Sequence, residues 1–155
     1  MSSPRDMQCF WIQSEFNNML MLYREGIPVP KPLAANGLAL AMEMIMEKGE
    51  PAPRLKDALI PKEKLPYLQK TLLASIEKML SLDLIHGDLS CYNILYAQGD
   101  PVIIDFPQMV NARYHSEAKT MLERDIRNVL LFCKTPEAEK EARQIAEGFG
   151  ENYNG

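Results

Sequence analysis

The segment from Leu84 to Gln108, LIHGDLSCYNILYAQGDPVIIDFPQ, constrains the fold most, because it places polar side chains beside two apolar runs. The runs NILY and PVII are short and are separated by a turn, which predicts two buried strands. Asp88, Asn93 and Asp105 lie at the mouths of these strands, and their oxygen atoms are of the kind that bind a hard metal ion. The segment therefore predicts a strand pair that carries a polar and chemically active end.

Size and composition set limits on the rest of the chain. It has 155 residues, of which 46% are hydrophobic, so it can bury one core, and we expect a single domain over residues 1–155. The formal net charge is −4 and basic residues form no run, which argues against direct binding of nucleic acid or an anionic membrane. No apolar stretch approaches the roughly 20 residues that cross a bilayer, so a cytoplasmic location is expected. The three cysteines lack CxxC spacing, so neither disulfides nor zinc are expected.

Apolar residues at helical spacing predict three long helices that pack against the core. They cover residues 12–25, 64–83 and 117–133, and Gly26 is the expected cap of the first one. A fourth helix is predicted to begin at Thr135-Pro136-Glu137, with the Thr135 hydroxyl as its cap, and to end at Gly148.

A β-hairpin is predicted between the first two helices, from Leu33 to Met42. Asn36 and Gly37 lie at its centre, and this pair favours a tight turn because both residues tolerate a positive φ. The proline-rich segment before the hairpin is expected to be an extended connector.

The oxygen-bearing residues of the first segment suit phosphoryl transfer. Asn93 and Asp105 would hold Mg²⁺, which favours oxygen ligands and completes its shell with water and nucleotide phosphates. Asp88 would remain free to accept a hydrogen bond from an attacking hydroxyl group. Taken singly, Asp88 and Asn93 suit an alternative role as turn caps, which is common for both residue types.

HGDLSCYN followed by IIDF resembles the HxDxxxxN and DFG-like motifs of the protein-kinase superfamily. With IDFPQ and the downstream RDIRN, the sequence is most similar to the RIO protein kinases, in particular their short prokaryotic members, from about Phe10 to Phe132. The resemblance implies that Asp88 is the catalytic aspartate, that Asn93 and Asp105 are the metal ligands, and that His86 is a structural residue of the catalytic loop. The implied cofactors are ATP and Mg²⁺, with Mn²⁺ as an alternative cation.

Two further site assignments follow from the same resemblance. Asp125 looks like the buried aspartate that anchors the catalytic loop from a core helix; the alternative is a solvated acid paired with Arg124 or Arg127. AMEMI matches the hinge between the kinase lobes, where the backbone of Glu43 and Ile45 would hold adenine and Met42 would be the gatekeeper. A plain hydrophobic strand end is equally compatible with these few residues.

Other features separate this chain from related kinases. Phe106-Pro107 replaces the Phe-Gly of DFG, and the short distance to the next helix leaves no room for a long activation loop. Aminoglycoside and choline kinases share HGDL, the asparagine and IDF, but SCYN and FPQ favour the RIO kinases.

The upper lobe of the implied kinase is incomplete in this sequence. Glu15 matches the glutamate that pairs with a strand lysine, but no lysine precedes Lys31 and no glycine-rich loop is present. Glu15 is equally compatible with a surface glutamate near a helix start. The resemblance thus implies an α+β, protein-kinase-like fold, with a partial N-terminal lobe of one helix and a hairpin in residues 1–45 and a largely helical C-terminal lobe in residues 46–155.

The leading functional hypothesis is ATP- and Mg²⁺-dependent phosphorylation of serine or threonine in an unidentified protein substrate, weak or absent in a chain without the glycine loop. The alternatives are a non-catalytic nucleotide- or protein-binding module and a small-molecule kinase. An open sheet edge and an exposed apolar helix face are also expected, which would favour self-association or a partner that supplies the missing strands.

Overall fold

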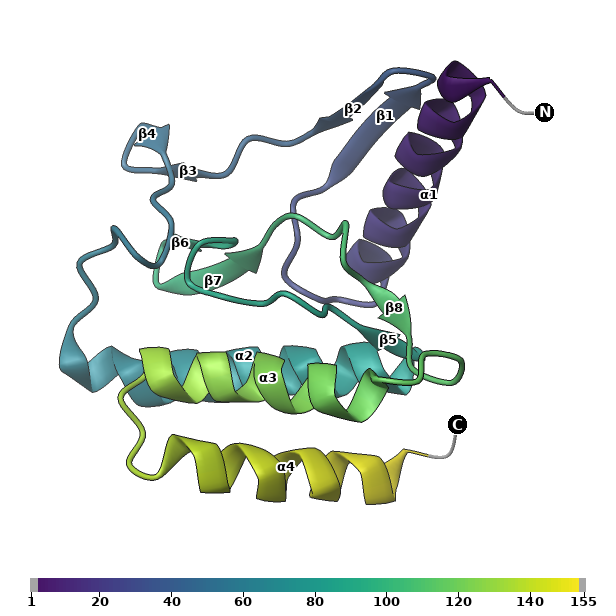
Figure 1. Ribbon diagram of the computed structural model, residues 1–155. Helices are drawn as coiled ribbons and strands as arrows, with labels where there is room; N and C mark the ends of the chain where they lie inside the picture. Colours follow the sequence, from purple (N-terminus) through teal and green to yellow (C-terminus); the bar gives the residue numbers. More distant parts are fainter. Residues whose placement is uncertain (1–2, 154–155) are drawn as a thin grey trace.

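The computed structural model describes residues 3–153, which form an upper part of one helix and a hairpin above a layer of helices (Figure 1). The helices are α1 (Pro4–Arg24), α2 (Leu65–Ser81), α3 (Ala118–Phe132) and α4 (Ala138–Asn152), with a short 3₁₀ helix at Lys62–Lys64. The strands are β1 (Pro32–Asn36), β2 (Ala39–Met42), β3 (Met46–Glu47), β4 (Glu50–Pro51), β5 (Leu84–Ile85), β6 (Ile94–Ala97), β7 (Asp100–Ile103) and β8 (Val110–Asn111). The predicted α+β architecture is confirmed.

The strands pair two by two in antiparallel fashion, β1 with β2, β3 with β4, β5 with β8 and β6 with β7. The predicted strands NILY and PVII correspond to β6 and β7, which lie between the upper part and the helical layer (Figure 1). Gln98 and Gly99 join them in a two-residue turn, with φ angles of 53° and 88°. The turn sets the register of the pair, so that Ile94 and Ile103 lie opposite each other at its far end, next to Asn93 and Asp105.

Helix α1 is longer than the apolar pattern predicted, because it begins at Pro4 rather than at Ile12. Ser3 and Asp6 form a reciprocal capping box that satisfies free amide groups of the first turn. The predicted cap at Gly26 is confirmed: Gly26 has a φ of 79°, and the next amide, of Ile27, donates to the carbonyl of Leu22 at 3.0 Å. Local capping signals therefore set both ends of this helix.

The predicted hairpin is confirmed, but its turn works differently from the expectation. Asn36 pairs with Ala39, and neither Asn36 nor Gly37 adopts a positive φ. The Asn36 side chain instead accepts hydrogen bonds from the amides of Leu38 at 3.1 Å and Ala39 at 3.0 Å. Gly37 has a packing role, since a Cβ there would lie 2.7 Å from Sγ of Cys9 in α1.

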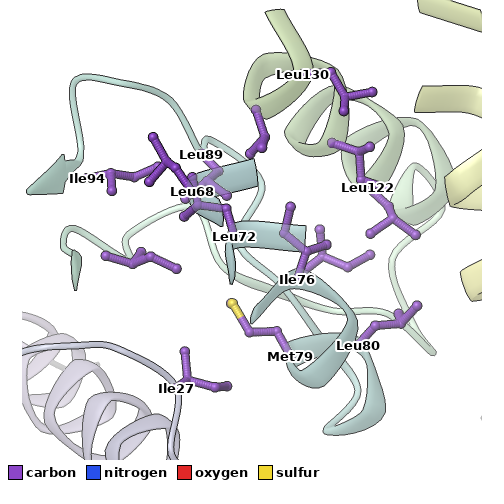
Figure 2. Close-up of a cluster of buried hydrophobic side chains, with 14 of the residues drawn as sticks. Ile27, Leu68, Leu72, Ile76, Met79, Leu80, Leu89, Ile94, Leu122 and Leu130 are labelled. Atoms are coloured by element: carbon purple, nitrogen blue, oxygen red, sulfur yellow. The ribbon is translucent and has the colours of Figure 1, made fainter. Parts of the chain in front are cut away.

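The core lies between α2, α3 and the strands above them. Helix α2 buries one stripe of side chains, and Figure 2 shows its Leu72 and Ile76 facing the same cluster as Leu122 of α3. Leu89, from the loop between β5 and β6, is completely buried in this cluster. Burial of one such side chain contributes about 1.5 to 3 kcal/mol. The loop that carries the candidate catalytic residues is thus attached to the core.

The start and end predicted for the last helix are wrong. Helix α4 begins at Ala138, after the proline, and the Thr135 hydroxyl donates to Oε1 of Gln69 in α2 at 2.6 Å instead of capping α4. Gly148 lies inside the helix, which continues to Asn152. Continuation keeps Phe149 packed against the core, so tertiary packing outweighs the unfavourable helix propensity of glycine.

Within the helix predicted from Ile12, apolar exposure is confirmed at Tyr23 alone, whereas Ile12, Phe16 and Leu20 are partly buried. The most exposed apolar residues of α1 precede that range: Phe10 and Trp11 are 71% and 69% exposed, and Leu38 of the hairpin turn is also exposed. Whether another chain covers these residues stays a prediction. Among the helices of residues 3–153, none combines the length and apolar character that a membrane crossing requires.

Candidate active site

Asp88 occupies the middle of the loop that joins β5 to β6, and its neighbours fix the loop backbone. The Asp88 amide donates to Nδ1 of His86 at 3.2 Å, and the Asp88 carbonyl accepts from Nδ2 of Asn93 at 2.6 Å. The residue is exposed, and no described residue makes a hydrogen bond with its carboxylate. Asp88 therefore presents an ionisable oxygen pair to solvent from a constrained backbone, as a general base requires.

Asn93 is buried and closes the same loop. Its Oδ1 accepts from the amide of Ser90 at 2.8 Å, while its Nδ2 bonds the Asp88 carbonyl. A carbonyl oxygen carries two lone pairs, so Oδ1 retains one for a cation. Asn93 thus maintains the loop whether or not it also binds a metal.

Asp105 lies beside Asn93 because the two strand ends are paired there. The amide of Ile104 donates to the carbonyl of Asn93 at 2.8 Å, and Asp105 follows directly. Asp105 is exposed and has a φ of 61°, a conformation that costs an aspartate roughly 1 kcal/mol and that recurs at functional sites.

The side chains of this site could supply two of the oxygen ligands that Mg²⁺ needs. Within residues 3–153, no three side chains of histidine, cysteine, aspartate or glutamate converge as a metal cage. Asp105 and Oδ1 of Asn93 provide one carboxylate and one amide oxygen. This is the small protein contribution that Mg²⁺ accepts when water and phosphate oxygens supply the other ligands.

His86 lies beneath the loop, 2% exposed, with its ring centroid 5.5 Å from that of Phe106. Burial lowers the pKa of His86 below its ordinary value, although the nearby carbonyl groups of Asp105 and Ile104 and the charge of Asp88 act in the opposite direction. Nε2 makes no hydrogen bond with the described residues. At neutral pH the ring is therefore uncharged and accepts the Asp88 amide, which is consistent with a structural role.

Asp125, from α3, reaches the loop on both sides of Asp88. Its Oδ2 accepts from the amide of Gly87 at 2.8 Å and its Oδ1 from the amide of Leu89 at 3.0 Å. The residue is 1% exposed, so it is not a solvated helix acid. Burial raises the pKa of Asp125 to about 6, while the two backbone hydrogen bonds lower it.

A cavity of about 260 Å³ opens beside Asp105, and the residues expected to hold adenine are among its lining. Its walls come from α1, from the end of β2 and the segment between β2 and β3, and from the β6–β7 region; the lining includes Met42, Glu43, Ile45, Leu95, Ile104 and Asp105. Four larger cavities, of about 330 to 750 Å³, lie against α4 and contain none of the polar residues of the loop.

The backbone between β2 and β3 offers the polar edge that adenine would need. The amide of Glu43 donates to Lys31, and the carbonyl of Ile45 accepts from Ala52, both at 2.9 Å. The carbonyl of Glu43 and the amide of Ile45 have no such partner in residues 3–153. One free acceptor and one free donor therefore lie on the wall of the cavity, next to Met42.

Glu15 lines the same cavity as Asp105, although the two are far apart in sequence. Burial and the negative charge of Asp105 both raise the pKa of Glu15. No lysine or arginine is among the described residues that line the cavity. The structure thus brings the predicted pairing glutamate to the site, but it shows no cation beside it.

Two residues that the sequence interpretation did not select also contact the loop. The guanidinium group of Arg124 donates to the carbonyl of Gly87, and Nδ2 of Asn128 donates to the carbonyl of Leu89 at 2.9 Å. The signal was available in RDIRN, because positions separated by four residues share one face of a helix.

The chain matches the RIO domain family over residues 1–145. It is 37% identical over 139 residues to the serine/threonine-protein kinase rio1 of Dictyostelium discoideum, a match that covers 87% of this chain and 24% of the relative. It is 31% identical over 137 residues to the RIO-type serine/threonine-protein kinase Rio1 of Haloferax volcanii, with coverage of 88% and 46%. For the protein of the same name from Thermoplasma acidophilum the identity is 32% over 142 residues, with coverage of 92% and 73%. The chain thus spans between about a quarter and a half of the first two relatives.

Proposed function

Because this chain belongs to the RIO domain family, we propose that it binds ATP with Mg²⁺ and transfers the terminal phosphoryl group to a serine or threonine of a protein. The relatives carry names of serine/threonine-protein kinases, and the geometry of the Asp88 loop supports the same chemistry here. That the acceptor of the phosphoryl group is a protein is also proposed here from these relatives.

One observation carries this proposal: the loop with Asp88 and the cavity wall with Asp105 are joined by the hydrogen bond from Ile104 to Asn93. A nucleotide in the cavity would therefore extend its phosphates toward both acids. Mg²⁺, when bound, would neutralise phosphate charge in the transition state.

Each residue of this chain has a separate role in the proposal. The carbonyl of Glu43 and the amide of Ile45 bind the adenine edge, and Met42 packs against the base. Asp105 and Asn93 hold the cation. Asp88 accepts the proton of the acceptor hydroxyl, since its carboxylate is exposed and has no hydrogen-bond partner among residues 3–153.

The test compares Mg²⁺-dependent ATP turnover and ATP affinity in the parent chain and in Asp88→Asn. We expect turnover to fall by about 10²- to 10⁴-fold, the usual contribution of a general base, while ATP affinity is retained. Asp57→Asn is the matched control, because Asp57 is an exposed aspartate that does not line the cavity. Equal turnover in the parent and in Asp88→Asn would contradict the catalytic role.

The absence of a cation from the described cavity lining favours a second candidate, a non-catalytic nucleotide-binding module. A lysine beside the phosphates supplies positioning and electrostatic stabilisation worth several kcal/mol. ATP binding without turnover in both the parent chain and Asp88→Asn would favour this second function.

A further inference from the structure

Every backbone polar group of Gly87, Asp88 and Leu89 has a hydrogen-bond partner, and helix α3 supplies most of these partners. Asp125 accepts from the amides of Gly87 and Leu89. The carbonyls of Gly87 and Leu89 accept from Arg124 and Asn128, respectively. We call Arg124, Asp125 and Asn128 the loop clamp. It holds the residue on each side of Asp88 by both its amide and its carbonyl.

The helix that carries the loop clamp, α3, is anchored in the hydrophobic core. Helix α3 buries Leu122, Ile126 and Leu130 in the core, and Figure 2 shows Leu122 and Leu130 on the α3 side of the same cluster as Leu89. The side chain of Leu89 is itself completely buried. The position of Asp88 is therefore set relative to the core through α3.

The three residues of the loop clamp differ in burial. Asp125 is almost fully buried, so its loss would leave two amides unpaired inside the protein. Arg124 is exposed and Asn128 is half-buried, so water can enter the space that either side chain leaves when it is truncated and can bond the released carbonyl. Their removal should therefore change the loop geometry more than the stability of the fold.

We propose that Arg124 and Asn128 are positioning residues, which act through the carbonyls of Gly87 and Leu89 to hold the Asp88 carboxylate in line with the acceptor hydroxyl. This inference rests on the proposed role of Asp88 as the base. Neither residue lines the nucleotide cavity, so their effect is on the chemical step and not on ATP binding.

The experiment measures the turnover number, the affinity for Mg²⁺-ATP and amide hydrogen exchange in Asn128→Ala and Arg124→Gln. We expect turnover to fall on the order of tenfold or more, since a displacement of about 1 Å can cost up to 10²-fold, with ATP affinity within about twofold of the parent. Arg124→Lys keeps a donor and should recover most of the activity. Arg127→Ala is the matched control, because Arg127 lies on the same helix but pairs with Glu139 of α4.

Hydrogen exchange separates this inference from the proposed function. The amides from Asp88 to Ser90 should exchange faster in Asn128→Ala than in Arg127→Ala, whether or not the parent chain turns over ATP.

Three other outcomes are distinguishable. If exchange is unchanged in Asn128→Ala, the positioning role is overturned even where turnover falls. If exchange is faster but an active parent keeps its turnover number in the variant, the loop clamp does not position the base. If the parent has no turnover but the exchange difference is present, the proposed function is wrong while the mechanical coupling of α3 to the loop stands.

Discussion

At the scale of single residues, the site depends on a few backbone positions that tolerate little change. Gly87 has a φ of 86°, and a Cβ there would lie 2.7 Å from the carbonyl oxygen of Gln108 and 2.5 Å from Cε of Met121. The methionine end can move, but the backbone carbonyl cannot. Gly87 therefore permits the close approach of the Asp88 loop to the segment after Asp105.

Gly87→Ala should destabilise the protein by more than the cost of placing alanine at a positive φ, because the added Cβ would also clash with Gln108. Gly99→Ala is the control, because Gly99 has a φ of 88° but nothing lies within 4 Å of its Cβ position. We expect Gly99→Ala to cost about 1 to 2 kcal/mol and Gly87→Ala about 1 to 3 kcal/mol more, measured by urea denaturation. Equal costs in the two variants would show that the crowding at Gly87 is relieved without strain.

Asp125 should make stability depend on pH in a definite direction. Its pKa is raised from 3.8 to about 6 in the folded protein, so the folded state holds the proton more tightly than the unfolded state does. The contribution of this group to the free energy of unfolding is therefore greatest below about pH 4 and decreases as pH rises from about 4 to 6.

The comparison is between the parent chain and Asp125→Asn, by urea denaturation from pH 4 to 7. The difference in free energy of unfolding, parent minus variant, should fall by about 2 to 3 kcal/mol across this range, since one pKa unit corresponds to about 1.4 kcal/mol. The backbone hydrogen bond that Asp125→Asn loses changes this difference by the same amount at every pH, so it does not alter the slope. A pH slope in Asp125→Asn equal to that of the parent would contradict the assignment.

At the scale of elements, contacts with neighbouring helices decide where helices begin. Thr135, Pro136 and Glu137 have the composition of a helix start, but Glu137 has a left-handed φ of 53° and α4 begins after it. The Thr135 hydroxyl instead joins the α3–α4 connection to α2. The stability of this corner therefore depends on an interaction between helices and not on a cap.

Thr135→Val should lower the free energy of unfolding by about 0.5 to 1.5 kcal/mol, because the nearly isosteric change removes one hydrogen bond to Gln69. Thr135→Ser keeps the hydroxyl and should be close to the parent. Helical content by circular dichroism should be the same in all three proteins. A loss of helical signal in Thr135→Val alone would instead indicate that the hydroxyl caps α4.

At the scale of the whole molecule, the candidate site exists only where separate parts of the chain meet. Its cavity takes Glu15 from α1, Met42 to Ile45 from the end of β2 and the residues after it, and Asp105 from the segment that follows β7. In Figure 1 these parts come from the upper helix, the connection toward β3 and the middle strands. Ligand binding should therefore stabilise the whole molecule and not one lobe.

Asp105→Asn tests the metal site at this scale, since asparagine tolerates the left-handed backbone but removes the charge. For the parent chain, Mg²⁺-ATP at about 100 times its Kd should add about 2.7 kcal/mol to the free energy of unfolding. In Asp105→Asn we expect Mg²⁺ to give little or none of this gain, while the variant without ligand unfolds like the parent.

Asp88→Asn is the control for this experiment, because it removes an equal charge nearby without removing a proposed metal ligand. It should keep the Mg²⁺-dependent stabilisation in a thermal or urea titration. Full Mg²⁺-dependent stabilisation of Asp105→Asn would mean that Asp105 is not the main ligand.

Residues close together along the chain were enough to predict most of the local structure and the polar residues of the candidate site. Apolar spacing predicted α2, α3, β6 and β7, and the β1–β2 hairpin was predicted from its strand and turn signals, because helix and strand periodicity and turn chemistry depend on residues close along the chain. The motif residues Asp88, Asn93 and Asp105 were found in the same way, since they lie within one short segment, in the loop before β6 and just after β7.

The contacts that support these residues come from distant parts of the chain. The family resemblance implied that Asp125 anchors the loop but not which groups it bonds. Asp125 and Gly87 are 38 positions apart, and Asn128 and Leu89 are 39 positions apart, so no local pattern predicts their hydrogen bonds. The same holds for Glu15, which meets Asp105 across the cavity, and for Thr135, which bonds to α2 instead of capping α4. Each of these contacts depends on which faces of distant elements pack together, and that choice is made by burial of the common core.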